Sequence, residues 1–104
     1  MKPYVSICIP VFKTEELLEE ALQSVLQNDV EHVSKNVEVI IVNDGSTSTN
    51  LQGLSCKQIV KKFKKNTKIK INYIEHSQNM GLVEARRSAV YAAKGEYIFF
   101  FDSD

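Results

Sequence analysis

Short apolar runs alternate with segments of helical spacing along the whole chain, and this alternation restricts the possible folds more than any other feature. The apolar runs are rich in β-branched and aromatic residues, which predicts strands at 5–9, 37–42, 69–74 and 97–101. Apolar residues at helical spacing predict helices at 14–28, around 59–63 and at 82–93. The order βαβαβαβ predicts an α/β fold in three layers, with a mainly parallel four-stranded sheet between helices.

Several segments sharpen this prediction. Thr14 is a candidate N-cap, because Glu15 and Glu16 then place negative charge in the first helical turn. Gly95 is well placed to end the last helix. Residues 29–36 are polar, and we expect them to form a loop.

The predicted strands differ in their apolar pattern. Residues 69–74 alternate only partly between apolar and polar, which fits a strand at the edge of the sheet. Residues 37–42 and 97–101 are apolar on both faces. Each of these two strands is therefore expected to be central or covered.

Composition and charge remove several classes of function. The 104 residues, 43% of them hydrophobic, suit one small domain or part of a larger one. Lys plus Arg and Asp plus Glu both number 13, so the chain lacks the basic excess of a nucleic-acid binder. Cys8 and Cys56 are expected to be free thiols in a reducing compartment. No apolar stretch approaches the roughly 20 residues of a membrane helix, so we expect a cytoplasmic location.

Three predicted strands are followed by side chains that can bind a ligand. Pro10, Val11 and Phe12 follow the first strand, Asp44 follows the second, and an Asp-Ser-Asp sequence at 102–104 follows the fourth. In an open parallel sheet, ligands bind beyond the carboxyl ends of the strands, where the strand order reverses. We therefore expect these groups to share one rim of the sheet.

Asp102 and Asp104 are the candidate metal ligands. In an extended chain, side chains two residues apart point the same way. Two carboxylates so close resist joint ionisation unless a cation lies between them. Their hard oxygens suit Mn²⁺ or Mg²⁺, which usually complete their coordination with substrate phosphates and water. The alternative is that both residues simply form a turn after the strand.

The other candidate residues each allow two interpretations. The Asp44 carboxylate accepts a hydrogen bond from a nucleobase N–H, or it caps the turn and holds local backbone amides. Phe12 covers a base, or it belongs to the core. Of Arg86 and Arg87, one is a solvent-facing arginine and the other is placed to reach a phosphate or a base. The sequence has no G-x-G-x-x-G after the first strand and no P-loop motif, which disfavours a dinucleotide-binding Rossmann domain and a P-loop NTPase. It also has no G-x-S-x-G, the motif of a nucleophile elbow.

Four segments together resemble the family 2 glycosyltransferases. Residues 5–12 (VSICIPVF) resemble the family's opening VSIIIP-x-YN, and residues 39–46 (VIIVNDGS) resemble its second-strand motif ending in DDGS. Residues 79–86 (NMGLVEAR) resemble N-x-G-x-x-x-A-R-N, and residues 95–104 (GEYIFFFDSD) resemble GEYI-x-FLD-x-D. The motifs occur in the family's order and span the whole chain, which makes the combination highly specific.

This resemblance implies a Rossmann-like GT-A fold with strand order 3-2-1-4 and a nucleotide-diphosphate sugar as donor, with a UDP-sugar as the first choice. Asp104 would ligate Mn²⁺ or Mg²⁺ directly, and Asp102 would lie near the ribose and the metal. The family reaction is an inverting displacement at the anomeric carbon, in which the metal stabilises the leaving diphosphate. The residues that the resemblance assigns to the nucleotide are Pro10, Val11, Phe12, Asp44, Arg86 and Asp102.

The chain also departs from the family pattern. Lys13, Asn43 and Arg87 stand where the family often has Asn, Asp and Asn. Family catalytic domains continue for roughly as many residues again, consistent with ordinary domain sizes. That part would hold the acceptor site and the general base. We interpret residues 1–104 as the N-terminal donor-binding part of a glycosyltransferase domain, truncated after the Asp-x-Asp motif and not expected to transfer sugar efficiently. The acceptor, whether glycan, lipid or protein, stays open.

Two further expectations concern partners. The strand at 97–101 would lie at a sheet edge, where an open apolar edge invites pairing and predicts a homodimer. The lysines between 57 and 70 either form an ordinary solvated face or dock peripherally on a membrane. The competing function is a non-catalytic nucleotide-binding or interaction module with the same fold.

Overall fold

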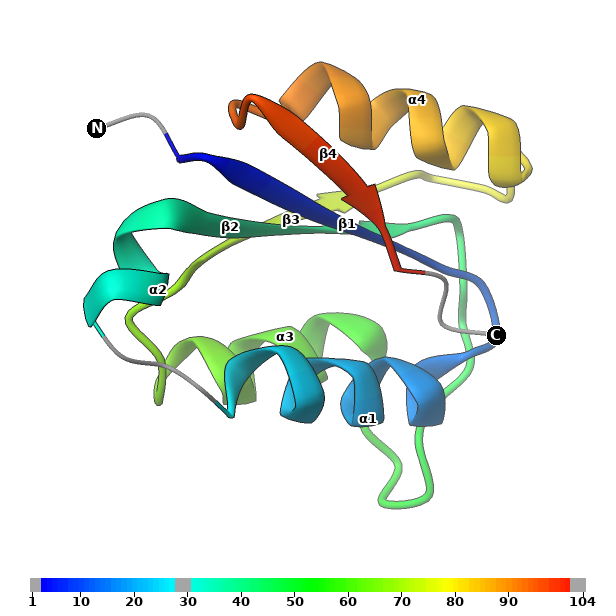
Figure 1. Cartoon of the computed structure of the whole chain (residues 1–104). Helices are drawn as coiled ribbons and strands as arrows, with labels where there is room; N and C mark the ends of the chain where they lie inside the picture. The colour runs from blue at the N-terminus through cyan, green and yellow to red at the C-terminus, as the bar shows by residue number, and fades with distance from the viewer. Residues whose placement is uncertain (1–2, 28–30, 102–104) are drawn as a thin grey trace.

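The computed structural model describes residues 3–27 and 31–101 (Figure 1). Its elements in chain order are β1 (Val5–Val11), α1 (Glu15–Leu26), α2 (Glu31–Asn36), β2 (Val37–Asn43), α3 (Cys56–Lys64), β3 (Lys70–Glu75), α4 (Leu82–Ala92) and β4 (Tyr97–Phe100). The sheet is parallel throughout, with strand order β3-β2-β1-β4. The predicted fold class and strand order are confirmed.

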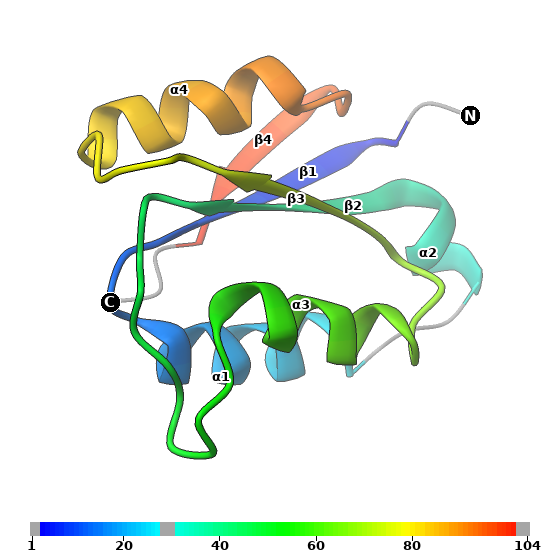
Figure 2. The same ribbon diagram turned by 180° about the vertical axis from the view of Figure 1, so that it is seen from behind.

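Helices cover both faces of the sheet and make the predicted three layers. Figures 1 and 2 show α4 on one face, and α1 and α3 side by side on the other. Successive side chains of a strand point to opposite faces, so β1 and β2 each contribute side chains to two separate hydrophobic cores. Ile9 and Ile41 pack on the side of α1 and α3, whereas Cys8 and Ile40 pack with Ala85 of α4.

Two local predictions were wrong. Residues 31–36 form the short helix α2 rather than a loop. A helix of fewer than two turns carries no periodic apolar stripe, so the polar composition of this segment hid it. The helix α4 ends at Ala92, and Gly95 is not its stop. Gly95 is instead required by packing, because a Cβ there would lie 2.7 Å from Ser6 Oγ.

The caps of the first two long helices differ. Thr14 occupies the predicted N-cap position of α1, but its side chain makes no capping hydrogen bond. Ser55, in contrast, begins α3 with a full capping box: its hydroxyl accepts from Gln58 N–H, and the Gln58 side chain accepts from Ser55 N–H. The Ser55 cap is the stronger helix start of the two.

The strand positions test the apolar patterns. β3 lies at one edge of the sheet and β2 lies inside it, as predicted. β4 lies at the other edge, and Tyr97 and Phe99 remain 59% and 58% exposed. The expectation that β4 is central or covered is therefore not met by the part of the chain that the structure describes. An apolar pattern shows that a strand needs cover but not which segment supplies it.

Cys8 and Cys56 are free and buried, in agreement with the prediction of free thiols. Burial, assisted by the nearby Glu38 carboxylate, raises the pKa of Cys8 to about 11. Burial, assisted by Glu15, raises the pKa of Cys56 to about 12. Across the described ranges, no helix has the length and apolar character needed to span a membrane.

Candidate functional site

The carboxyl ends of β1 and β2 meet at one rim of the sheet. Val11 pairs in register with Asn43, so Phe12 and Asp44 follow two strand ends that lie side by side. A pocket of about 310 Å³ opens at this rim, against the start of α4. Its lining residues are Pro10, Val11, Phe12, Thr14, Asp44, Asn79, Gly81, Leu82 and Ala85. The parallel pairing thus places Phe12 and Asp44 on the common rim that the sequence predicted.

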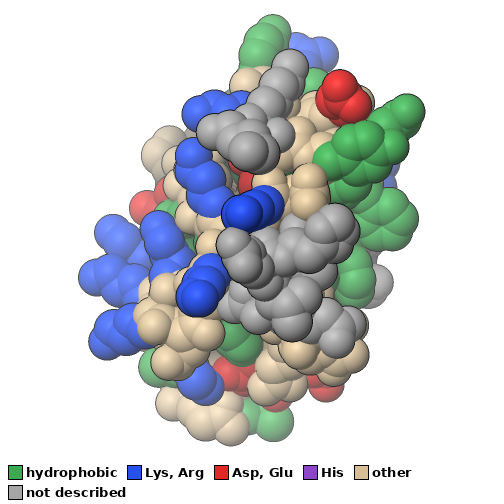
Figure 3. Space-filling view, turned by 60° about the vertical axis from the view of Figure 1, so that its left-hand side comes forward, with side chains coloured by type: hydrophobic (Ala, Val, Ile, Leu, Met, Phe, Trp, Pro, Cys, Tyr) green, Lys and Arg blue, Asp and Glu red, His purple; other side chains and the backbone are tan. Residues whose placement is uncertain are grey.

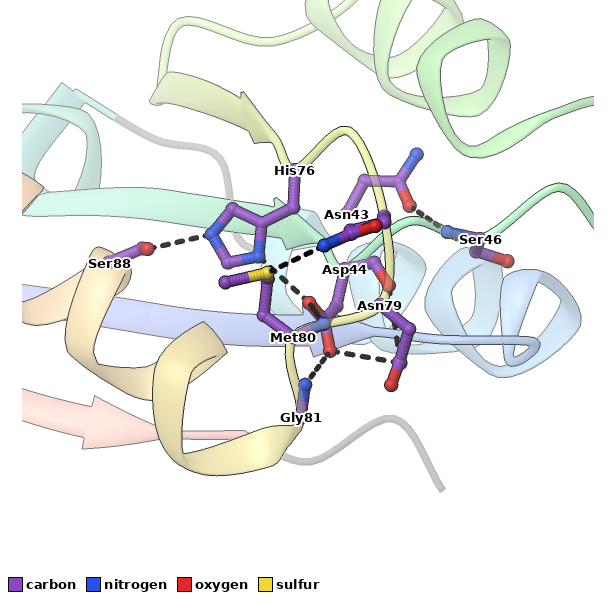
Figure 4. Close-up of polar contacts among 9 residues, drawn as sticks. Asn43, Asp44, Ser46, His76, Asn79, Met80, Gly81 and Ser88 are labelled. Carbon is purple, nitrogen blue, oxygen red and sulfur yellow. Dashed lines mark hydrogen bonds and ion pairs between the residues drawn. The ribbon is translucent and has the colours of Figure 1, made fainter.

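Asp44 is the best-connected polar side chain of this rim (Figure 4). It is 3% exposed. Its Oδ1 accepts from Met80 N–H at 2.9 Å and lies 2.8 Å from His76 Nδ1. Its Oδ2 accepts from Gly81 N–H at 3.0 Å and from Asn79 Nδ2 at 3.1 Å. A carboxylate offers about four acceptor positions, and all of them are filled here.

The charge of Asp44 is stabilised by these donors. Burial by itself raises the pKa of the carboxyl group, because desolvation penalises the charged form. The hydrogen bond from His76 and those from the Met80 and Gly81 amides outweigh that effect, and the net pKa lies below its ordinary value. Asp44 therefore stays ionised next to the start of α4, where the helix dipole also favours negative charge.

Two glycines allow the chain to form this rim. Gly81 has φ 95° and begins α4 while donating its N–H to Asp44. Gly45 has φ 74°, and a Cβ there would lie 2.3 Å from the Gln78 carbonyl carbon. Both conformations are rare for residues with a side chain. The turn after β2 and the segment before α4 are therefore pressed together, backbone against backbone.

The predicted site residues divide into three groups. Pro10, Val11 and Phe12 line the pocket together with Asp44. Arg86 is not among the lining residues; its guanidinium lies 5.3 Å from the centre of the Phe100 ring, between α4 and β4. Asp102 and Asp104 lie outside the described residues. Within the described ranges, no group of three or more His, Cys, Asp or Glu side chains is arranged to hold a metal ion.

Sequence reasoning missed part of the pocket wall. Asn79, Gly81, Leu82 and Ala85 belong to the segment that carries Arg86, yet only Arg86 was assigned a role. The signal was present, because Asn-x-Gly marks a tight approach of backbone to a ligand or a neighbouring segment. His76 was not detectable, since nothing in the sequence places it beside Asp44.

The departures from the family pattern are accommodated locally. Lys13 has φ 59°, the left-handed region in which Asn is enriched; its N–H donates to Ser46 Oγ at 3.0 Å. Asn43 uses its amide group in both directions, donating to Tyr73 Oη at 2.9 Å and accepting from Ser46 N–H at 2.8 Å. Arg87 is exposed and pairs with Glu84 at 3.5 Å, as expected for the solvent-facing arginine.

Comparison with known proteins decides the family. Residues 6–104 match the family described as "Glycosyl transferase family 2". The chain belongs to this family. It is 32% identical over its whole length to the uncharacterized glycosyltransferase EpsJ of Bacillus subtilis, of which it covers 27%. It is 38% identical over 96% of its length to a poly(ribitol-phosphate) beta-glucosyltransferase of Bacillus spizizenii, of which it covers 14%.

Solved structures agree with this assignment. Staphylococcus aureus TarS 1–349 in complex with UDP-GlcNAc has a TM-score of 0.79 and 28% identity, and the match covers 97% of this chain and 26% of that one. The mannosyltransferase PcManGT of Pyrobaculum calidifontis, in complex with GDP-Man and Mn²⁺, has a TM-score of 0.79 at 21% identity, with 100% and 28% covered. The second similarity shows the fold alone. The chain therefore spans 26% and 28% of these two solved chains.

Proposed function

We propose that this family 2 chain is the donor-binding part of a glycosyltransferase, and that it binds a nucleotide-diphosphate sugar with a divalent cation. One observation carries the proposal: the pocket at the carboxyl ends of β1 and β2 is built from family motifs, with Phe12 and Asp44 in its wall. A UDP-sugar is the preferred donor, because TarS, 28% identical to this chain, has been solved with UDP-GlcNAc.

The nucleobase is assigned to Pro10, Val11 and Phe12. Phe12 lines the pocket and is 39% exposed, so a base can cover the apolar face of its ring. Asp44 is assigned to a base N–H, but its acceptor positions are already filled. A base must therefore displace one donor. The Asn79 side chain is the exposed donor, whereas the Met80 and Gly81 amides are fixed by the backbone.

The phosphates and the cation are assigned to the other side of the pocket. Arg86 directly follows the lining residue Ala85, and its guanidinium lies 5.3 Å from the centre of the Phe100 ring. Arginine is assigned this role because a guanidinium can bind a phosphate or a base through two parallel hydrogen bonds. Asp102 and Asp104 would hold Mn²⁺ or Mg²⁺ together with the donor diphosphate. The cation would supply Lewis-acid stabilisation of the leaving diphosphate in an inverting transfer.

The general base and the acceptor site are assigned to the part of the relatives that this chain does not match. The 104 residues alone are therefore expected to bind donor without efficient transfer. We place the whole protein in the cytoplasm, in synthesis of a polysaccharide or another glycan.

Titration calorimetry with UDP and MnCl₂ tests the proposal. The chain should release heat that saturates with one nucleotide per chain, and Asp104→Ala should abolish most of it because a cation ligand is lost. Glu20→Ala, which removes an exposed carboxylate from α1, is the matched control and should bind like the parent. Absence of heat from the parent chain would favour the alternative, an interaction module that keeps the fold without nucleotide binding.

We further propose that β4 pairs with a second copy of the chain. Tyr97 and Phe99 expose their rings at an open strand edge, and such edges pair readily with other strands. Size-exclusion chromatography with light scattering should show a concentration-dependent dimer, and Phe99→Lys should shift it to monomer. A single monomeric peak at high concentration would rule this dimer out.

A further inference from the structure

A hydrogen-bonded chain of three side chains runs from the pocket wall to the middle of α4. His76 Nδ1 lies 2.8 Å from Asp44 Oδ1, and His76 Nε2 lies 2.8 Å from Ser88 Oγ (Figure 4). His76 follows β3 directly, and its N–H donates to Asn43 O of β2 at 2.9 Å. His76 therefore links the end of β3 to β2 through its backbone N–H, and links Asp44 to α4 through its ring. Neither His76 nor Ser88 lines the pocket.

The proton positions follow from the chemistry of the end groups. An ionised carboxylate only accepts hydrogen bonds, so His76 Nδ1 carries a proton. In the neutral ring, Nε2 then accepts from the Ser88 hydroxyl group. In the protonated ring, Nε2 donates to the Ser88 oxygen instead. The serine can reverse its role by rotating one hydrogen, so both bonds persist in either state of the ring.

We propose that His76 and Ser88 are positioning residues for the nucleotide pocket, and that they act by holding the Asp44 carboxylate in place. This inference rests on the proposed nucleotide binding. Asp44 in turn holds the amides of Met80 and Gly81 and the side chain of Asn79. Gly81 and Asn79 form part of the pocket wall. Loss of the His76 bond leaves Oδ1 with the Met80 amide as its remaining donor, so the carboxylate and the wall that it holds are less firmly fixed.

The same three residue types occur in hydrolases, where the serine is a nucleophile. The geometry here does not support that role. Ser88 lies inside α4, its hydroxyl group is directed at His76, and it does not open on the pocket that would hold a substrate. The chain of bonds ends at a carboxylate that is itself part of the pocket wall, which fits positioning rather than attack.

Four variants test the proposal through UDP affinity, measured by calorimetry in MnCl₂ with this chain. His76→Leu removes both bonds and should weaken binding roughly tenfold, the cost of one charge-assisted hydrogen bond. His76→Asn keeps an N–H donor near the position of Nδ1 and should recover most of the loss. Ser88→Ala should weaken binding by about threefold, the cost of a neutral hydrogen bond. Ser24→Ala, a matched change on an exposed helical position of α1, should have no effect.

The double variant His76→Asn with Ser88→Ala separates positioning from general destabilisation. If Ser88 acts only through the histidine ring, Ser88→Ala adds nothing in the His76→Asn background. Hydrogen exchange gives a second readout: His76→Leu should speed exchange of the Met80 and Gly81 amides while core amides of β2 keep their protection. If His76→Leu does not fold, Ser88→Ala and the double variant decide alone.

The outcomes separate the two proposals. A parent chain that does not bind UDP refutes the proposed function. The positioning role alone is refuted if the parent chain binds UDP and both Ser88→Ala and the double variant bind it with the same affinity as the parent, while amide exchange at Met80 and Gly81 is unchanged. Equal losses from Ser88→Ala in both backgrounds also refute it, because the serine would then act without the ring.

Discussion

A buried carboxylate lies near each end of β2, Glu38 in the strand and Asp44 directly after it, and the two groups make different contacts. Glu38, near the amino end, is 2% exposed and Asp44, at the carboxyl end, is 3% exposed. Within the described residues, one oxygen of Glu38 accepts from both Ser6 Oγ at 2.6 Å and Lys94 N–H at 2.7 Å. Asp44 accepts on both oxygens. Its donors are the Asn79 side chain and the Met80 and Gly81 amides, which lie just before α4, and the His76 ring.

A tightly packed glycine accompanies each carboxylate. Gly45 presses against the backbone of residues 78 and 79, and Gly95 presses against Ser6. Each pair joins one end of the α4 segment to the sheet: Asp44 and Gly45 hold its start, and Glu38 and Gly95 hold the chain just after its end. The two ends therefore share one structural device, a buried carboxylate that binds backbone amides beside a glycine contact.

Pocket volume is not the reason for assigning the proposed site to the carboxyl end of the sheet. The larger pocket, about 880 Å³, lies at the amino end and includes Lys35, Lys70 and Lys94 in its wall. Lysine and arginine side chains gather on that face (Figure 3). The pocket at the carboxyl end is smaller, but it contains the motif residues and lies where open parallel sheets bind ligands. Chemistry and topology outweigh volume here.

The largest expected difference between the two ends comes from Gly45. Gly45→Ala should lower the free energy of unfolding by about 4 kcal/mol, because it combines a positive φ with a steric clash against backbone. Gly53 is a matched control: it has φ 81° but nothing within 4 Å of an added Cβ. Gly53→Ala should cost only about 1 kcal/mol. Urea denaturation measures both, and equal costs would mean that the contact with residue 78 is unimportant.

The next largest effect is expected for Asp44→Asn, which should lower the free energy of unfolding by about 3 kcal/mol. The new amide group turns one acceptor oxygen into a donor, which then faces N–H groups that donated to the carboxylate. UDP affinity should fall with it. Chemical denaturation measures the loss of stability, and calorimetry measures the loss of UDP affinity. A variant as stable as the parent would show that the four donors do not depend on the Asp44 carboxylate in solution.

The acid dependence of stability should also depend on Asp44. Its pKa is lower in the folded chain than the usual value of about 3.9 in unfolded chains. Its stabilising contribution is therefore complete above that value and is lost as the pH falls through the folded-state pKa. Denaturation curves between about pH 6 and pH 3 should show a smaller decline in Asp44→Asn than in the parent chain. Parallel declines would contradict this assignment.

The smallest effect is expected at the other end of β2. Glu38→Gln should cost about 1 kcal/mol or less, because a single amide oxygen can accept from both Ser6 and Lys94. The UDP affinity of the Glu38→Gln variant should equal that of the parent chain. A loss as large as that of Asp44→Asn, in stability or in binding, would erase the proposed difference between the two ends.

Several features of the fold were predictable because they depend on local pattern. The apolar runs of β1, β2 and β3 and the helical spacing of α1 and α4 identified the elements, and their alternation identified the parallel sheet. The strand order came from the family resemblance rather than from any pattern. The helix α2 was missed, because six residues with a single apolar side chain, Val33, give no period to detect.

The candidate site was predictable only in part. Phe12 and Asp44 were expected on one rim, since parallel strands align their carboxyl ends, and they lie there. Their proposed roles in nucleotide binding stay predictions, as does the metal site at Asp102 and Asp104. The second interpretation of Asp44, as a group that holds backbone amides, describes its contacts in the structure.

The sequence by itself determined the strands and the three longer helices, though not α2. It also determined the rim of the sheet at which Phe12 and Asp44 meet, because periodicity is a local property of the chain and parallel strands align their carboxyl ends. Only the tertiary structure decided that His76 reaches Asp44, 32 residues away along the chain, and that Ser88 reaches His76, 12 residues away. Such contacts depend on how β3 and α4 pack against β2. No local pattern encodes that packing, because each of these residues is equally compatible with an exposed position in its own segment.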